Sequence, residues 1–225
     1  MADRTHSSDL EATGAPAEIE REYGPFPDVP QVHGVSFDGE RVWFASGEKL
    51  YALDPATGER VRTLEVRCDA GTAFDGKHLY QLAAGRIQKI DPETGALVKT
   101  IAAPEPAEDS AGLTWAEGTL WIAQYRNRRI LQVDPETGEV LRTLQSDRFV
   151  TGVTFAGDEL WHGTLEDDVS ELREIDAGSG RVRARVRMPA GSVITGLESD
   201  GRDRLYAGGG KTGVVRALRK PRRRA

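Results

Sequence analysis

Residues 112–144 read GLTWAEGTLWIAQYRNRRILQVDPETGEVLRTL, and they are the clearest copy of a pattern that recurs along the chain. Four short segments with alternating or continuous apolar residues, at 112–115, 119–123, 130–134 and 140–144, are typical of β-strands. The Asp-Pro-Glu-Thr-Gly connection combines the preset φ of proline with a glycine that tolerates positive φ, as a tight turn requires. The segment therefore predicts four antiparallel strands joined by short turns.

Five copies of this pattern are present. They begin at Gly34, Gly71, Gly112, Gly152 and Gly196, and their first strands read GVSFDG, GTAFDG, GLTWAEG, GVTFAG and GLESDG. A repeat of about 40 residues that contains four strands is typical of a propeller blade. No segment has the 3.6-residue apolar period of a helix. We therefore predict an all-β fold, a five-bladed β-propeller of four-stranded antiparallel blades.

The last copy ends after its third strand, at 214–218. Residues 17–23 alternate like an outer strand, so we expect this N-terminal strand to complete the fifth blade and close the ring, which removes an exposed edge. The expected organisation is a disordered segment over 1–16, a single propeller domain over 17–218 and a basic tail over 219–225. The tail is either a solvated end or a weak tether for anions or nucleic acid.

Composition narrows the setting in which the protein acts. The 225 residues carry a formal net charge of -6 and a single cysteine, Cys68, so no internal disulfide is possible. The N-terminal residues lack the apolar segment of a signal peptide, and no run is long enough to span a membrane. We expect a cytoplasmic monomer with no membrane partner. The acidic net charge also argues against a nucleic-acid-binding body.

Function is expected at one face of the ring. The loops that enter each blade and the loops between its second and third strands lie at the same face, which we call the mouth. The sequences of these loops differ from copy to copy, whereas the Asp-Pro-x-Thr-Gly turns of the opposite face are repeated. Their carboxylates, histidines and cations suit a small anionic or zwitterionic ligand and acid–base chemistry. The expected catalytic residues are His33, His162, Glu166 and Glu198. The expected substrate-binding residues are Asp69, Asp109, Tyr125, Arg126, Arg148 and Lys211.

Two of these residues have alternative interpretations. His162 occupies a position where the other copies have Phe44, Gln81, Ile122 and Ala207, so it is either an interblade core residue or a functional one. Glu198 replaces the small residues Ser36, Ala73, Thr114 and Thr154 in the inward register of the first strands. A carboxylate there is costly unless it is paired or protonated. It belongs either to a channel water network or to the site, as a general acid/base with a raised pKa or as a metal ligand.

The repeat core, strand-x-Asp-Pro-x-Thr-Gly-x-Val-x-x-Thr-Leu, resembles the propellers of the glutamine cyclotransferases. It also resembles the broader group that contains virginiamycin B lyase and the YVTN-type repeat proteins, and the likeness runs from Ala17 to about Leu218. Cyclotransferases convert N-terminal glutamine to pyroglutamate. Their first blade usually contains Phe-Thr-Gln-Gly-Leu and Tyr-Glu-Ser-Thr-Gly, where this chain has Gln31-Val-His-Gly-Val35 and Trp43-Phe-Ala-Ser-Gly47. The resemblance thus implies a small-molecule enzyme of this group with an altered active site, because Phe44 replaces the acidic residue.

Two other functions stay open at the level of sequence. One is a non-catalytic propeller that binds a ligand or a protein. The other is a metal-assisted lyase or hydrolase, in which a divalent metal would be the cofactor. A deep polar pocket at the mouth favours an enzyme, whereas a flat or plugged mouth favours a scaffold.

Overall fold

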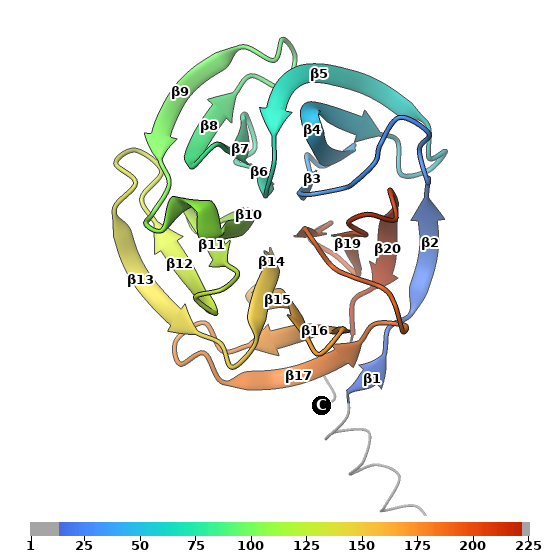
Figure 1. Cartoon of the computed structure of the whole chain (residues 1–225), viewed down its shortest axis with the longest axis vertical. Helices are drawn as coiled ribbons and strands as arrows, with labels where there is room; N and C mark the ends of the chain where they lie inside the picture. The colour runs from blue at the N-terminus through green and yellow to red at the C-terminus, as the bar shows by residue number, and fades with distance from the viewer. Residues whose placement is uncertain (1–13, 222–225) are drawn as a thin grey trace, which may run out of the picture.

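The computed structural model describes residues 14–221, which form a ring of five antiparallel sheets (Figure 1). Blade 1 contains β3 (Val35–Phe37), β4 (Val42–Leu53) and β5 (Arg60–Cys68). Blade 2 contains β6 (Thr72–Phe74), β7 (Leu79–Ala83), β8 (Arg86–Ile90) and β9 (Leu97–Ala102). Blade 3 contains β10 (Ser110–Ala116), β11 (Thr119–Gln124), β12 (Arg129–Val133) and β13 (Val140–Gln145). Blade 4 contains β14 (Phe149–Ala156), β15 (Glu159–Glu166), β16 (Val169–Ile175) and β17 (Val182–Arg187).

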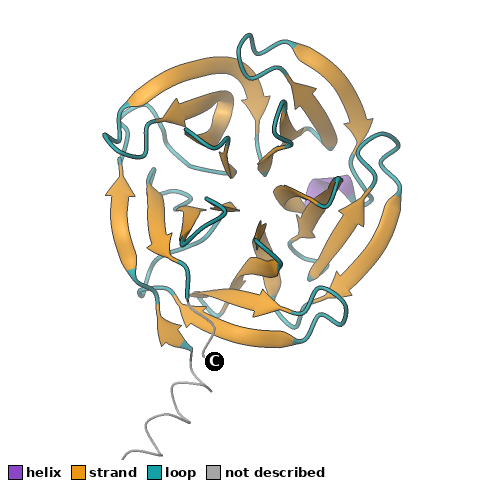
Figure 2. Ribbon diagram, turned by 180° about the vertical axis from the view of Figure 1, so that it is seen from behind, coloured by secondary structure: helices purple, strands orange, loops and turns teal. Residues whose placement is uncertain are grey.

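Blade 5 confirms the expected closure of the ring. It contains β18 (Leu197–Ser199), β19 (Arg204–Gly208) and β20 (Val215–Arg219), and its outer strand is β2 (Ile19–Tyr23). In blade 1, the single strand β4 fills the second and third positions and bends at Gly47, where φ is 63°. Viewed from behind, the five sheets again radiate around one centre (Figure 2). The all-β, five-bladed prediction is therefore confirmed.

The two ends of the described chain are more ordered than we expected. Strand β1 (Ala15–Pro16) pairs in parallel with Val186 and Arg187 of β17, so the expected disordered segment over 1–16 is too long at its C-terminal end. Residues 1–13 lie outside the described residues. Of the expected basic tail, Arg219 is the last residue of β20, and Lys220 Nζ lies 2.7 Å from Glu159 Oε2. Residues 222–225 also lie outside the described range.

Each pair of neighbouring blades encloses one apolar cluster. Between blades 3 and 4, for example, the cluster contains Trp121, Val153, Leu160 and Ile175. The five anchor glycines make the innermost strands fit together. A Cβ atom on Gly112 would lie 2.6 Å from the Cα of Gly152, and one on Gly71 would lie 2.4 Å from the amide nitrogen of Leu113. These contacts leave no room for a side chain, which explains why each copy of the repeat begins with glycine.

The repeated turns lie at the face opposite the mouth, and each is bound by the preceding blade. In the first of them, Asp54 accepts hydrogen bonds from the backbone of Ala56 and Thr57, and Gly58 has a φ of 83°. Cations on the outer strands donate to the carbonyl oxygens of the next turn: Arg21 to Pro55–Thr57, Arg62 to Glu93, Lys99 to Glu136 and Arg142 to Ala177. We call these contacts the interblade clasps. Among residues 14–221, no helix is long and apolar enough to cross a membrane.

Candidate active site at the propeller mouth

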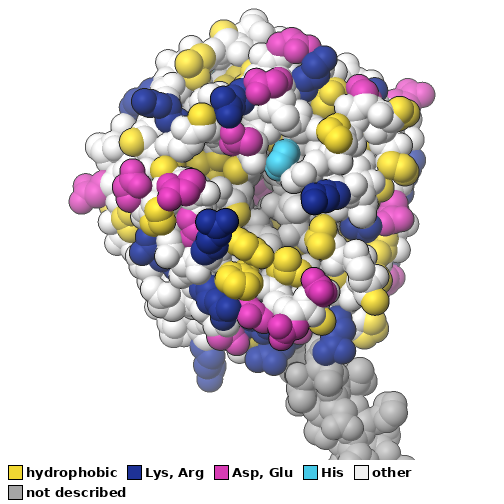
Figure 3. All heavy atoms as spheres, in the orientation of Figure 1, with side chains coloured by type: hydrophobic (Ala, Val, Ile, Leu, Met, Phe, Trp, Pro, Cys, Tyr) yellow, Lys and Arg dark blue, Asp and Glu magenta, His cyan; other side chains and the backbone are white. Residues whose placement is uncertain are grey.

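The mouth contains a cavity of about 690 Å³. Its lining comes from the entry segments of all five blades and from the loops after β11 and β19. The space-filling view shows a hollow over the centre of this face, with apolar, acidic and basic side chains around it (Figure 3). Six of the ten expected site residues line the cavity: His33, Asp69, Asp109, Tyr125, Arg126 and Lys211.

His33 is held by the backbone on both sides. Its amide donates to the carbonyl of Ala45, and the preceding Val32 forms a bridge with Gly210. The amide nitrogen Nε2 of Gln31 lies 3.3 Å from His33 Nδ1 and can only donate to it, so the neutral imidazole carries its proton on its own Nε2. Burial lowers the pKa of His33, and the nearby carboxylate of Asp69 partly opposes this shift. At neutral pH, His33 is therefore an uncharged imidazole with an N–H to donate.

Two hydroxyl groups in the cavity have no hydrogen-bond partner among residues 14–221. Thr151 is 8% exposed, and its Oγ1 is buried and unpaired; the Oγ of Ser110 is buried and unpaired as well. Buried polar groups are normally hydrogen-bonded, since an unmet one costs about 1–3 kcal/mol. Leu165, Val193 and Ile194 form an apolar part of the wall nearby. The cavity thus offers polar groups for a ligand to satisfy, beside an apolar surface.

The lining contains three acidic residues, and two of them, Asp69 and Asp109, have different tasks. Both carboxylate oxygens of Asp109 accept backbone N–H groups, from Arg126 and Asn127, each at 2.8 Å. Asp109 is 8% exposed, so it shapes the loop that carries Tyr125 and Arg126. Asp69 keeps more freedom: its carboxylate lies 3.4 Å from Arg67 Nε, receives long hydrogen bonds from the amide of Ala84, and is 42% exposed. Asp69 and the exposed Glu108 are the acidic groups of the lining that a ligand can reach.

Arg126 and Lys211 supply the positive charge of the lining. Neither side chain has an ion-pair partner among the described residues, and Lys211 is exposed on the loop after β19. Tyr125 forms another part of the wall and stacks on Phe149, with ring centroids 4.8 Å apart. The guanidinium group of Arg128 lies 4.3 Å from the Phe149 ring and donates to Glu166.

The remaining four expected residues do not line the cavity. Glu166 is paired with Arg128 at 2.9 Å, and Arg148 Nη1 lies 3.5 Å from Glu171. His162 is 1% exposed, inside the interface between blades 3 and 4, with no partner for either ring nitrogen. Burial and the neighbouring Arg173 lower its pKa to about 3. The structure therefore places His162 in the interblade core, the first of the two interpretations that the sequence left open.

An ionic network of the buried Arg173 and Glu171 and the exposed Asp147 lies beside His162. Arg173 is 2% exposed and contacts Glu171 through Nε at 3.0 Å and Asp147 through Nη1 at 2.5 Å. His162 and Arg173 are partners in the β15–β16 register, where the equivalent pair of blade 3 is Ile122 and Leu131. This network replaces apolar packing, and the strand pattern gave no sign of it, because its members are separated by up to 26 residues.

Glu198 lies in the central channel, as its register predicted. It is 8% exposed and accepts hydrogen bonds from Thr154 Oγ1 at 2.5 Å, from the amide of Ser199 at 2.9 Å and, at 3.4 Å, from Thr114 Oγ1. Burial raises its pKa to about 7, although these hydrogen bonds oppose the shift. Glu198 lies two residues after the anchor glycine Gly196 and is not part of the cavity lining.

The lining also contains residues that the sequence analysis did not single out, among them Gln31, Thr151 and Ser110. Gln31 and Thr151 lie in the variable entry segments, so their position was a usable signal, but small hydroxyl side chains look unremarkable in such segments. The described residues contain no group of three His, Cys, Asp or Glu side chains that could hold a metal ion. His33 and Asp69 alone do not make a metal site, so the donor set does not fit the divalent metal that the sequence left open.

A family model described as "Outer membrane protein assembly factor BamB" matches residues 46–220. No curated protein sequence matches the chain significantly. Among solved structures, the glutaminyl cyclase of Myxococcus xanthus is similar with a TM-score of 0.73 and 16% identity, over 90% of this chain and 95% of that one. U3-55K has a TM-score of 0.57 and 10% identity, over 90% of this chain and 99% of that one. The hydrazine synthase of Kuenenia stuttgartiensis reaches 0.50 and 20% identity, over 80% of this chain and 56% of that one. At these identities the likenesses show a shared fold.

Proposed function

The chain belongs to the outer membrane protein assembly factor BamB family of propellers, and we propose that its mouth cavity binds a small anionic or zwitterionic molecule and acts on it by acid–base chemistry. The observation that carries this proposal is the combination, in one cavity, of a neutral His33, a reachable carboxylate and two unpaired hydroxyls. A pocket with an apolar wall and a few convergent polar groups is the usual form of a small-molecule site.

Each group has a place in the proposed chemistry. Arg126 and Lys211 attract the anionic end of the ligand, while Thr151 and Ser110 bond its polar atoms inside the cavity. The neutral imidazole of His33 first takes a proton from the ligand at Nδ1, in place of the hydrogen bond from Gln31, and Asp69 stabilises the imidazolium that results. This imidazolium then gives the proton to the leaving oxyanion, which restores the neutral ring. The similarity to a glutaminyl cyclase supports a small-molecule reaction on this fold, but Phe44 stands where cyclotransferases have an acidic residue.

A metabolite screen by thermal unfolding tests the proposal. A ligand that binds only the folded state raises Tm in proportion to the logarithm of its concentration. For any hit, Lys211→Ala should weaken binding about two- to fivefold, because it removes one exposed charge worth up to about 1 kcal/mol. Lys77→Ala, an exposed lysine of blade 2 outside the lining, is the matched control and should leave binding unchanged.

His33 separates an enzyme from a binding protein. If the propeller is catalytic, His33→Gln should reduce turnover by 100-fold or more, within the usual range for a general acid–base group, and bind ligand about as well. A hit that is bound but never converted by the wild type would support the non-catalytic propeller instead. Absence of any ligand that responds to Lys211→Ala would overturn the mouth site.

A further inference from the structure

The charge of this protein is unevenly distributed along the chain. Residues 181–225 contain thirteen basic residues (Lys and Arg) and three acidic ones (Asp and Glu), a net charge of +10. Residues 1–180 contain seventeen basic and thirty-three acidic residues, a net charge of -16. The overall charge of -6 hides this separation. Segregated basic charge is a common property of surfaces that bind polyanions.

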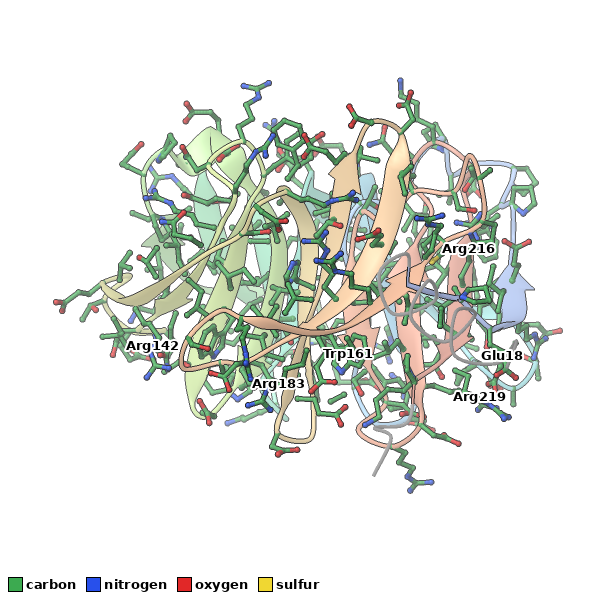
Figure 4. The ribbon with its side chains drawn as sticks, turned by 90° about the horizontal axis from the view of Figure 1, so that it is seen from below. Glu18, Arg142, Trp161, Arg183, Arg216 and Arg219 are labelled. Atoms are coloured by element: carbon green, nitrogen blue, oxygen red, sulfur yellow. The ribbon has the colours of Figure 1, made fainter. Side chains whose placement is uncertain are left out.

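The fold brings much of this basic charge to the outer edge of blade 4. Arg183, Arg185 and Arg187 alternate along β17 with residues that face the core, and Arg181 directly precedes them. Lys220 and Pro221 line a cavity of about 400 Å³ together with Val186 of β17, so the C-terminal end leaves the propeller beside this strand. We call Arg181, Arg183, Arg185, Arg187, Arg219 and Lys220 the basic edge. In Figure 4, which faces this side of the ring, Arg183 lies on one flank and Arg219 on the other.

Three of the six cations of the basic edge form ion pairs, and the other three form none within the described residues. Arg183 is bound by Asp176, Arg219 lies 3.0 Å from Glu20, and Lys220 is paired with Glu159. Arg181, Arg185 and Arg187 make no ion pair within residues 14–221, and Arg181 and Arg187 are exposed. The sequence adds three more arginines at 222–224, outside the described residues. Arg181 and Arg187 are therefore exposed cations without an ion pair among residues 14–221, whereas Arg185 lies near enough to Asp147 to help lower the pKa of that carboxyl.

We propose that the basic edge binds the phosphate backbone of double-stranded nucleic acid without sequence preference. Guanidinium groups bind phosphate oxygens bidentately, and the free cations of this edge are arginines. No exposed aromatic side chain lies among the described residues, so the stacking platform of single-strand binders is missing.

The shape of the charge distribution favours a narrow polyanion over a membrane. The basic edge runs along β17 of blade 4 and the end of β20 in blade 5, whereas residues 1–180 carry a net charge of -16. A lipid bilayer is a plane that also meets the acidic neighbours, whereas a duplex can follow the edge alone. The exposed large apolar side chains lie on blades 1–3, away from this edge, at Val61, Leu97, Val98, Val140 and Leu141. No apolar anchor therefore accompanies the arginines.

Fluorescence anisotropy of a labelled 20-base-pair DNA duplex tests this proposal with the full chain. Binding at 50 mM salt is expected, with log K falling against log salt at a slope of about -3 to -5 for three to six phosphate contacts. The double variant Arg181→Glu with Arg187→Glu should weaken binding at least tenfold and reduce the slope by about 2. The control is Lys77→Glu with Arg86→Glu, which makes the same change in net charge on two exposed residues of blade 2.

Four outcomes would overturn the proposal. The first is that the duplex does not bind at 50 mM salt. The second is that both double variants lose the same amount of duplex affinity, which would show that only the net charge of the protein matters. The third is binding to vesicles containing anionic lipid but not to duplex. The fourth is binding that requires removal of residues 1–13, which would make this segment of the chain the occupant of the edge. Because none of the four substituted residues lines the mouth cavity, failure here leaves the proposed small-molecule site intact.

Discussion

Glu198 is the one carboxylate among the five inward positions Ser36, Ala73, Thr114, Thr154 and Glu198. Burial raises its pKa from 4.5 to about 7, so the folded state binds this proton more tightly than the unfolded state does. The resulting stability is fully present below pH 4.5 and is lost as pH rises through 7. Glu198→Gln keeps the side-chain volume and removes the titrating group. As pH rises from 5 to 8, the unfolding free energy of the variant should therefore increase relative to that of the wild type, by up to about 3 kcal/mol. Urea unfolding of both proteins at the two pH values measures this, and identical pH dependence would contradict it.

His162 should show the opposite pH dependence. Its pKa is lowered to about 3 by burial and by Arg173, so the folded state binds the proton less tightly than the unfolded state. This stability is present above pH 6.5 and is lost as pH falls toward 3. His162→Gln, which introduces the side chain found at the equivalent Gln81, should lose less stability than the wild type between pH 7 and 4. The measurement is urea unfolding across that range, and an unchanged slope in the variant would show that His162 does not titrate on unfolding.

At the scale of strands and turns, the interblade clasps bind each repeated turn to the blade before it. Arg62 Nη1 donates to the carbonyl of Glu93 at 2.6 Å, and its Nη2 donates to the Glu93 carboxylate at 2.7 Å. The group is 29% exposed, which reduces the value of these contacts. Arg62→Met, which keeps most of the aliphatic stem, should cost about 1 kcal/mol in unfolding free energy. Lys77→Met is the control, because no side-chain contact of Lys77 is lost, and equal effects would show that the clasp contributes nothing.

The closing strand β2 should matter far more than the residues before it. Four residue pairs join β2 to β20, and Tyr23 is buried in the cluster between blades 5 and 1. Deleting residues 1–24 exposes the edge of β20 and opens that cluster, so cooperative unfolding should be lost or Tm should fall by more than about 10 °C. Deleting residues 1–13 keeps every described contact and should change Tm by no more than about 2 °C. Comparable losses from both deletions would contradict this account.

For the whole molecule, the sequence was informative wherever the repeat imposed the same local geometry five times. The anchor glycines and Asp-Pro-x-Thr-Gly turns depend on backbone conformation and close approach, which are visible in each copy. The clasps and the Arg173 network were not predicted, because they join side chains from different copies or from distant strands. A polar residue within a strand is normally read as facing solvent, so the buried Glu171 and Arg173 gave no signal. The mouth was predicted as a region, but which residues line its cavity depends on loop paths that the repeat does not specify.

The way in which the ring closes leads to a prediction about the whole chain. Ala15 and Pro221 line the same cavity, so a short linker can join the two ends in a circular permutant. If the chain is opened between Glu93 and Thr94, in the β8–β9 turn, β9 comes from the new N-terminal end and the other strands of blade 2 come from the new C-terminal end. Blade 2 is then completed by a strand from the other end of the chain, as blade 5 is completed by β2 in the natural order. Opening it between Glu105 and Pro106 leaves every blade contiguous, so only packing between blades 2 and 3 holds the gap. The first permutant should be more stable by at least about 1 kcal/mol, or 2–4 °C in Tm, because strand pairing across the opening resists separation of the blades. Urea and thermal unfolding of the two permutants decide this, and a more stable second permutant would show that the shared blade is not what holds the ring closed.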